Sequence, residues 1–548
     1  MKVFAYLMNL LSLSFFTILS LNSFSNNPKQ PNVVLFLADD MELDYLSCFG
    51  GGIPTPNIDI LAKEGIRFLN ASISSSACTP SRYSLLTGKY AGRCDHPDFI
   101  RDNPIDEMAL IGWNTPISEN DFTLARLFGQ AGYYTGFAGK WHVGVQRNKL
   151  NLPVIDENED PSDFETNQKL QQYQLVLQEE VKKTGGFDVA NSVLWENFEQ
   201  APLRKLRYHN FEWITKGALD FIEHAPKEKP FFLYVASTAI HGPNYISSFN
   251  QNPQFTLSGK TVYLEDSPSR QEITDLLNNR NLQFNSLNLG ITQLDEQFAA
   301  IYNKLIEKKL DKNTIIIFLS DHNREPGKGT CYEKGVKVPL LIKWPDAAKA
   351  GCETNTYVQS VDIFPTLVDA CNLKTESNVK VDGKSFMPLL NQEQFQGRDD
   401  LYYEFGYTRA ISDGKFKYIA FRYPKKILNE LEKDQVNEAP NHLNSRLRSH
   451  ACITIQYYPG YFDQDQLYDL NNDPYEQRNL AKRPEYECVL RSMKNRLDSV
   501  LHTMKHPFNL QQQQIFESDE FKKMKQNTID IGTDHIPWWK DITWPPKI

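Results

Sequence analysis

The stretch Asn32-Val33-Val34-Leu35-Phe36-Leu37-Ala38, followed at once by Asp39-Asp40, indicates the fold of this chain. An apolar run of this length without polar alternation is typical of a strand buried on both faces of a parallel sheet. Similar runs predict further strands at Tyr133–Ala138, Phe231–Ala236, Thr314–Leu319 and Pro339–Trp344. Helical patterns lie between them, so we expect an α/β fold with a mostly parallel central sheet sandwiched by helices.

The pattern changes after about residue 390. Arg409–Ser412 and Lys415–Ala420 flank Asp413-Gly414, which is typical of a β-hairpin with a tight turn. We therefore expect a smaller C-terminal α+β domain built on an antiparallel sheet. The predicted domains are a signal peptide at 1–25, a catalytic domain at 26–390 and a C-terminal subdomain with a terminal extension at 391–548.

The net charge and the N-terminal sequence limit the partners and the cellular location that we expect. The 548 residues carry a net charge of −9, which argues against a nucleic-acid partner and means that a polyanionic substrate needs a local basic pocket. Lys2, the apolar stretch 10–21 and the small residues at 23–25 are typical of a secretory signal. The alternative, a membrane anchor, would need about 20 apolar residues. We expect an exported, periplasmic or secreted protein without a stable membrane anchor.

The eight cysteines are scattered through the chain, which does not indicate a disulfide scaffold. Without Cys78 their number is odd, so at least one other should be free. Cys78 itself has no second Cys or His at zinc-ligand spacing. Thr79-Pro80 suits the start of a helix, and this would place Cys78 at a positive helix N-terminus with Arg82 one turn further on. The alternatives for Cys78 are an ordinary buried cysteine and a thiolate nucleophile.

Polar groups follow the predicted strands, at the edge where parallel sheets bind ligands. They are Asp39-Asp40, Gly139-Lys140-Trp141-His142, His241 and Asp321-His322. Adjacent buried carboxylates need a cation, and a mostly oxygen ligand set suits Ca²⁺ or Mg²⁺ better than Zn²⁺. The alternative is that Asp39-Asp40 only caps a turn or helix. The matching Asp321-His322 favours the metal.

Two segments resemble the signatures of the type I, formylglycine-dependent sulfatases of the alkaline phosphatase superfamily. Ser76–Gly88 (SACTPSRYSLLTG) is similar to the family's first signature, and Gly132–His142 (GYYTGFAGKWH) to its second. The resemblance implies that Cys78 is oxidised to formylglycine (3-oxoalanine), whose hydrate is the nucleophile. It also implies that Lys140 contacts the sulfate and that His142 contacts the hydrated aldehyde.

Other segments extend the resemblance over residues 31–500. In the family's terms, His241 of Thr238–Pro243 is the general acid, Asp321-His322 belong to the metal site with Asp39, Asp40 and residue 78, and Lys328 is a second sulfate-binding lysine. Arg82 is assigned with the catalytic residues. Asn323 stands where the family usually has Gly, and Lys334 and Lys337 depart from its usual Gly and Arg, so Lys337 receives no catalytic role.

The resemblance implies a sulfatase, a sulfuric ester hydrolase that uses a calcium ion. We expect a sulfated carbohydrate substrate of algal type, such as ulvan or carrageenan, and a formylglycine-generating or anaerobic sulfatase-maturing enzyme as partner. The alternatives are a phosphonate or phosphate ester hydrolase of the same superfamily, and a catalytically silent carbohydrate-binding homologue. Residues 93–96 and the long insertion at 145–210 are expected to shape the substrate pocket, or else to be plain surface loop.

Overall fold

The structure is a computed structural model that describes residues 30–261, 267–324, 326–344, 350–375, 379–433, 454–455, 457–513 and 519. The predicted signal peptide and most of the C-terminal extension lie outside these residues. Within the described ranges no helix has both the length and the apolar character needed to cross a bilayer.

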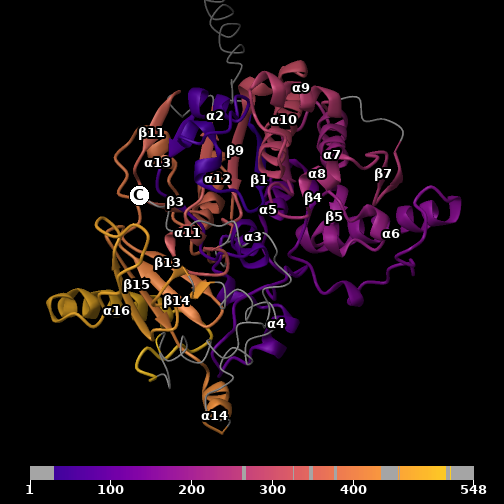
Figure 1. Ribbon diagram of the computed structural model, residues 1–548. Helices are drawn as coiled ribbons and strands as arrows, with labels where there is room; N and C mark the ends of the chain where they lie inside the picture. Colours follow the sequence, from indigo (N-terminus) through magenta and orange to yellow (C-terminus); the bar gives the residue numbers. More distant parts are fainter. Residues whose placement is uncertain are drawn as a thin grey trace, which may run out of the picture.

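The large sheet has the strand order β11-β2-β10-β9-β1-β6-β4-β5 (Figure 1). All its strands run in the same direction except β10, which is antiparallel to both of its neighbours. The predicted α/β class is thereby confirmed. The strands are β1 Asn32–Ala38, β2 Ile66–Phe68, β4 Tyr134–Lys140, β5 Val189–Leu194, β6 Phe231–Ala236, β9 Thr314–Ser320, β10 Leu340–Lys343 and β11 Cys352–Thr354.

Strand β1 occupies the centre of this sheet because its residues are apolar on both faces. Val33, Leu35 and Leu37 belong to one hydrophobic core, while Val34, Phe36 and Ala38 belong to another on the opposite face. Full burial of an aliphatic side chain of this kind stabilises a fold by about 1.5–3 kcal/mol. A strand that contributes to two cores can only lie inside a sheet that is covered on both faces.

Different helices build the two cores. Helices α7 and α10 supply Leu219, Leu294 and Phe298 to the core beneath Phe36. Helices α3, α5, α6 and α12 cover the face to which Leu35 points. The helices are α2 Asp59–Glu64, α3 Cys78–Thr87, α4 Pro97–Asp102, α5 Leu124–Gln130, α6 Phe164–Gly185, α7 Phe211–His224, α8 Tyr245–Phe249, α9 Arg270–Asn279, α10 Ser286–Glu307, α11 Glu333–Val336, α12 Ile363–Ala370, α13 Met387–Leu390, α14 Lys425–Lys433 and α16 Glu487–Leu501.

A second, four-stranded antiparallel sheet follows in the chain, and the predicted hairpin lies at its centre. Its order is β13-β14-β15-β16, with Ser412 of β14 opposite Lys417 of β15. Gly414 adopts a φ of +86° in the connecting turn, a backbone region that favours glycine. The strands are β13 Leu401–Phe405, β14 Thr408–Ser412, β15 Phe416–Phe421 and β16 Asp465–Asp469. Short two-stranded ribbons join β3 Ala71–Ser72 to β12 Val358–Gln359, and β7 Phe255–Thr256 to β8 Gly259–Lys260.

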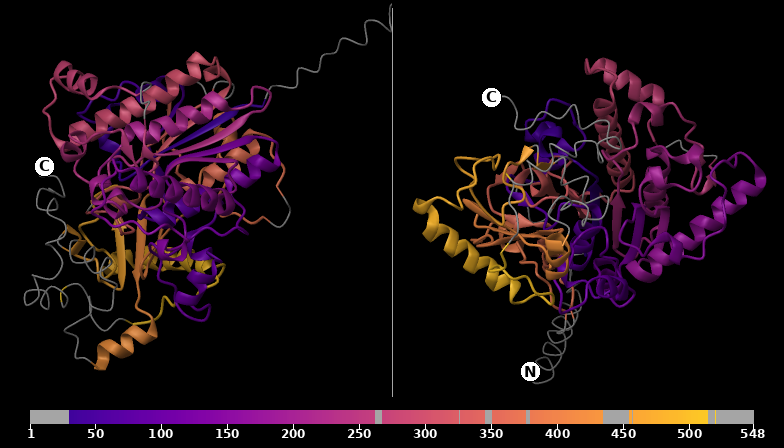
Figure 2. Two further views of the ribbon diagram at one scale, coloured as in Figure 1. Left: turned by 90° about the vertical axis from the view of Figure 1, so that its right-hand side faces the viewer. Right: turned by 60° about the horizontal axis from the view of Figure 1, so that its bottom comes forward.

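The small sheet packs against the segment that carries Lys328. One of its faces holds α16, and the other contacts Tyr332 and Val336. Tyr332 stacks on Tyr458 with ring centroids 3.8 Å apart and donates a hydrogen bond of 2.6 Å to Gln466 of β16. Figure 2 shows the small sheet set against one end of the large one. The small sheet therefore supports the loop that carries Lys328, and this loop approaches the carboxyl ends of the strands of the large sheet.

In the large sheet the structure departs from the expected strands in the direction of β10 and in the presence of β2, β5 and β11, which had not been predicted. Pro339–Trp344 does form a strand, but β10 runs antiparallel to β9, with Leu340 opposite Leu319. Its buried apolar sequence is compatible with either direction, so the pattern could not reveal this. Strand β5 had not been predicted, because Ser192 and Asn191 interrupt its apolar run at the edge of the sheet.

Candidate active site

The polar groups predicted at strand ends meet at one edge of the large sheet. Asp39 and Asp40 follow β1, Asp321 and His322 follow β9, and Lys140 is the last residue of β4. Because β1, β9 and β6 run parallel, their carboxyl ends lie side by side. The first residue of α3 is Cys78, which faces this edge.

Cys78 is surrounded by charged groups. Its Sγ lies 3.1 Å from Nε2 of His322, 3.6 Å from Nζ of Lys140 and 3.7 Å from Oδ1 of Asp39. Only 1 % of the residue is exposed. Burial and the Asp39 charge raise the pKa of the Cys78 thiol, but the charges of Lys140, His322 and Lys328 together more than offset this and lower the pKa to about 6. The cluster thus stabilises negative charge at position 78.

Asp39, Cys78, Asp321 and His322 form a candidate metal centre, with ligand atoms within 4.8 Å of one another. Burial and the neighbouring Asp39 raise the pKa of Asp321 to about 7, which is the cost of placing two carboxylates together without a cation between them. A metal ion would relieve that repulsion. Carboxylate oxygens with one imidazole nitrogen suit a hard divalent cation, so the residues present fit such an ion.

Asp40 stands apart from this cluster. Its carboxylate accepts hydrogen bonds of 2.8 and 2.9 Å from Nζ of Lys328 and lies 3.1 Å from Nδ1 of His322. Burial raises the Asp40 pKa, but the charges of Lys328, His241 and His322 together outweigh burial and lower it. Asp40 therefore joins the second predicted lysine to the metal cluster. Asp40 has a φ of +61°, so the chain changes direction directly after β1.

Arg82 and Lys140 complete the positive side of the site. Nε and Nη2 of Arg82 donate to Oδ2 of Asp321 at 3.0 and 2.8 Å, and Nη1 donates to the Lys140 carbonyl at 2.7 Å. Lys140 forms an ion pair with Asp39. Together with Lys328, these two residues make three buried cations, which face the three buried carboxylates of Asp39, Asp40 and Asp321. Because the charges of the site balance, an anion and a divalent cation can bind together at little net electrostatic cost.

His241 lies on the other side of the site. Its Nδ1 is 3.0 Å from the Gly242 carbonyl and 3.9 Å from Oε1 of Glu199. Burial, together with the charges of Lys328 and Lys140, holds the His241 pKa well below its ordinary value. An anion bound between these lysines would offset their charge and bring the imidazole back towards protonation.

Sequence reasoning missed two residues next to His241. Nε2 of His209 is 2.9 Å from the His241 carbonyl, and His209 also stacks on Tyr245, with ring centroids 4.3 Å apart. Glu199 approaches His241 from the 145–210 insertion. Both residues come from segments without a recognisable motif, so only the tertiary structure brings them here.

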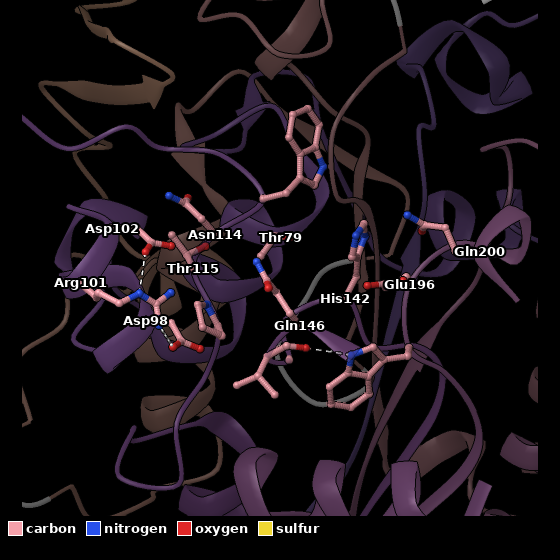
Figure 3. Close-up of a pocket in the computed structure, with 15 residues that line it drawn as sticks. Thr79, Asp98, Arg101, Asp102, Asn114, Thr115, His142, Gln146, Glu196 and Gln200 are labelled. Atoms are coloured by element: carbon pink, nitrogen blue, oxygen red, sulfur yellow. Dashed lines mark hydrogen bonds and ion pairs between the residues drawn. The ribbon is translucent and has the colours of Figure 1, made fainter. Parts of the chain in front are cut away.

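His142 and Thr79 line a hollow of about 180 Å³. Figure 3 shows Asp98, Arg101 and Asp102 on one side of this hollow and Glu196 and Gln200 on the other. Of the insertion at 145–210, the residues that line this hollow are Val145, Gln146, Trp195, Glu196 and Gln200.

Residues 93–96 do not line this hollow. Nε of Arg93 pairs with Asp382 at 2.9 Å, and its Nη2 donates to Thr503 at 2.7 Å, so this side chain anchors distant segments. The Cys94 thiol is buried against the Pro116 carbonyl. The hollow is lined instead by the helix that follows these residues, α4, through Asp98, Arg101 and Asp102. The described cysteines are all free, and Cys452 lies outside the described residues.

The low pKa of Cys78 gives a pH-dependent signal in protein whose Cys78 is unconverted. In metal-free buffer we expect its thiolate absorbance in the ultraviolet to appear as the pH rises through about 6, measured as a difference against Cys78→Ser. Lys140→Met removes the largest stabilising charge and should move the transition upwards by at least about one pH unit. A transition that does not move in this variant would contradict the assigned cause.

Comparison with known proteins decides the family. A family model described as Sulfatase matches residues 31–373, and a second, described as N-sulphoglucosamine sulphohydrolase, C-terminal, matches residues 327–447. The chain belongs to the sulfatase family. This sulfatase is a sulfuric ester hydrolase, and the predicted family membership is confirmed.

Curated relatives resemble this sulfatase over most of its length. It is 26% identical to N-acetylgalactosamine-6-O-sulfatase of Bacteroides thetaiotaomicron, over 86% of this chain and 94% of that protein. It is 24% identical to an ulvan-active sulfatase of Formosa agariphila, over 84% of this chain and 78% of that protein.

Solved structures share its fold. Ps i-CgsB in complex with k-i-k-neocarrahexaose aligns with a TM-score of 0.55 at 20% identity, over 93% of this chain and 99% of the other. A phosphonate monoester hydrolase of Agrobacterium radiobacter aligns with a TM-score of 0.55 at 19% identity, over 86% and 95%. At this identity the likeness concerns the fold alone.

Proposed function

We propose that this sulfatase removes sulfate from a carbohydrate sulfate ester through a formylglycine at position 78 and a bound calcium ion. The observation that carries the proposal is the setting of Cys78 at the start of α3, with Lys140, Asp39 and His322 all within 3.7 Å of its sulfur. The sulfur stands where an oxygen of the hydrated aldehyde would be. The carbohydrate relatives support the substrate class.

The chain's residues have distinct roles in this proposal. One hydroxyl of the hydrated residue 78 attacks sulfur, and Lys140 and Lys328 hold the sulfate oxygens and offset their charge. His241 protonates the sugar oxygen as its bond to sulfur breaks. The second hydroxyl on residue 78 then loses its proton, the carbonyl re-forms and sulfate leaves. Arg82 holds Asp321 in place throughout, and His142 contacts the hydrated aldehyde.

A calcium ion would be held by Asp39, Asp40, Asp321 and His322 together with an oxygen on residue 78, and it would supply positive charge that polarises the sulfate. The oxygen-rich donor set favours Ca²⁺, with Mg²⁺ as the second choice. Asp40 reaches such a site only if its bond to Lys328 loosens, which leaves Lys328 able to hold sulfate.

The burial of Cys78 bears on its modification. With 1 % of the residue exposed, a converting enzyme cannot reach it in the folded chain. We therefore place conversion before folding, by a formylglycine-generating or anaerobic sulfatase-maturing enzyme. The signal-like segment at 1–25 supports export to the periplasm or beyond.

Mass spectrometry of the peptide carrying residue 78 tests this mechanism. Expression with a converting enzyme should yield the aldehyde, and desulfation of defined sulfated oligosaccharides should depend on it. An unmodified thiol in fully active protein would contradict the proposal. The second candidate is a phosphonate ester hydrolase, favoured by the shared fold. Faster turnover of a phenyl phosphonate monoester than of phenyl sulfate would support it.

Replacing His241 should affect substrates unequally. We expect His241→Gln to slow desulfation of a sugar sulfate by about 10²–10⁴-fold, because a sugar alkoxide needs a proton to leave. The loss on 4-nitrophenyl sulfate should be much smaller, since nitrophenolate leaves without one. Steady-state kcat for the two substrates makes the comparison. Equal losses on both would assign His241 a positioning role instead.

A further inference from the structure

His241, the proposed general acid, lies in a segment without regular secondary structure. Strand β6 ends at Ala236 and helix α8 begins at Tyr245, and the residues between them form neither helix nor strand. A group that delivers a proton in the transition state has to be held within a fraction of an ångström of its productive position. Because neither a strand ladder nor a helix fixes this segment, the position of His241 depends on side chains from elsewhere in the chain.

Two buried aromatic side chains donate hydrogen bonds to the His241 carbonyl. Nε2 of His209 and the hydroxyl of Tyr245 each lie 2.9 Å from this oxygen. The two rings are stacked, with centroids 4.3 Å apart and 9° between their planes. A carbonyl oxygen has two lone pairs, so two donors held together by stacking fix the direction in which it points.

The hydrogen-bond partners of His209 determine which of its nitrogens carries the hydrogen. A carbonyl can only accept, so Nε2 of His209 must donate to His241, and Nδ1 then accepts from Oγ1 of Thr238, which is 3.0 Å away. Burial lowers the pKa of His209 to about 4, so the ring is uncharged at neutral pH. His209 thereby ties together two residues of the irregular segment that stand three positions apart.

The orientation of the His241 ring depends on the same backbone. Its Nδ1 lies 3.0 Å from the Gly242 carbonyl and donates to it, which leaves Nε2 as the nitrogen that can deliver a proton. A tilt of the peptide group between His241 and Gly242 would move this acceptor and turn the imidazole with it. Fixing the His241 carbonyl therefore also fixes the ring.

We infer that His209 is a positioning residue for the general acid, because its bond to the His241 carbonyl keeps the His241 imidazole turned towards the departing oxygen. The inference rests on the proposed function and adds a second histidine to it, from a segment without a recognisable motif. Both nitrogens of His209 are engaged in hydrogen bonds, so His209 acts through His241 alone. Its loss should matter only where the leaving group needs a proton.

His209→Gln and His209→Asn form a matched pair of variants. The amide nitrogen of Gln can take nearly the place of Nε2 and donate to the His241 carbonyl, whereas the shorter Asn side chain does not reach that place. Both variants bury one amide at the same position, so their apparent Tm values should fall by similar amounts. A difference in activity between them then reports on the bond to His241 rather than on stability.

Two aryl sulfates supply the kinetic readout in full-length protein that bears formylglycine. An ordinary phenol has a pKa of about 10, so phenyl sulfate needs a proton on its leaving oxygen more than 4-nitrophenyl sulfate does. We expect His209→Asn to lower kcat/KM for phenyl sulfate by about 10–10²-fold and for the nitrophenyl ester by less than about threefold. His209→Gln should stay within about threefold of wild type on both esters.

A double variant separates positioning from a general structural role. In protein that already carries His241→Gln, His209→Asn should lower kcat/KM for phenyl sulfate by less than about twofold, because no general acid remains to be positioned. Losses that multiply in the double variant would overturn the inference. So would equal activity of His209→Asn and His209→Gln on phenyl sulfate, or an equal loss in His209→Asn on both esters.

Crystal structures of the two variants test the inference without turnover. The His241 ring should leave its 3.0 Å contact with the Gly242 carbonyl in His209→Asn and keep it in His209→Gln. An unmoved ring in His209→Asn would contradict the assigned role. If neither ester is hydrolysed by protein that bears formylglycine, the proposed function fails, while these two structures still decide whether His209 holds His241.

Discussion

Cys78→Ser is expected to abolish turnover and to trap a sulfated enzyme. A serine hydroxyl can attack sulfur, but it has no second hydroxyl whose loss of a proton would expel the sulfate. Steady-state desulfation should fall by at least about 10³-fold, as for loss of a covalent nucleophile. Incubation with 4-nitrophenyl sulfate should release at most one nitrophenol per enzyme and add one SO₃ group to the peptide carrying residue 78.

Cys78→Ala is the matched control, because it removes the nucleophile and should acquire no SO₃. Both variants keep a small side chain at the start of α3, so their apparent Tm should stay close to that of wild type. Multiple turnovers by Cys78→Ser at a rate near wild type would show that a geminal diol is not required. A sulfated peptide in Cys78→Ala would place the nucleophile elsewhere.

Asp321→Asn is expected to have the largest effect on stability. The carboxylate accepts two hydrogen bonds from the fully buried Arg82 guanidinium, and its removal leaves that guanidinium with the Lys140 carbonyl and the 3.7 Å contact to Asp39. In calcium-saturated protein, where the cation would relieve the repulsion from Asp39, breaking this buried ion pair costs about 3–5 kcal/mol, which should lower the apparent Tm by roughly 5 °C or more. Differential scanning calorimetry makes the measurement.

Calcium provides the second readout for this variant. A ligand that binds only the folded state at 100 times its Kd adds about 2.7 kcal/mol. Calcium should therefore raise the Tm of chelator-treated wild-type protein but not that of Asp321→Asn. Asp369→Asn, an exposed substitution of the same kind on α12, should keep the full calcium response. A calcium response in Asp321→Asn as large as that of wild type would remove Asp321 from the metal site.

The strands that carry the site could be predicted because their signal is local. The residue ranges of β1 and β6 agree with the predicted strands, since each is a continuous apolar run with polar residues on either side. The placement of Asp39 and Asp321 at one edge followed from parallel strand direction alone. Strand β4 ends at Lys140, two residues beyond the predicted end, because Gly139 and Lys140 continue the pairing although they lack apolar side chains.

Pairing between distant residues could not be predicted in this way. Lys328 bonds to Asp40 across 288 positions of sequence, and the loop carrying Lys328 is held by Tyr332 against the small sheet. Nothing in the neighbourhood of either residue indicates that bond. The hollow shows the same limit, because it is lined by helix α4 and by the segment 195–200, which are far apart in the chain.

The sequence by itself determined the strand-end chemistry, the helix start at Cys78 and the sulfatase resemblance, because these depend on residues that are neighbours in the chain. Only the tertiary structure decided which cation faces which carboxylate and the direction of β10. These features depend on electrostatic and packing contacts that form once the chain has closed on itself. The residues of the site could therefore be predicted from motifs, whereas the pairing among them emerged from the folded geometry.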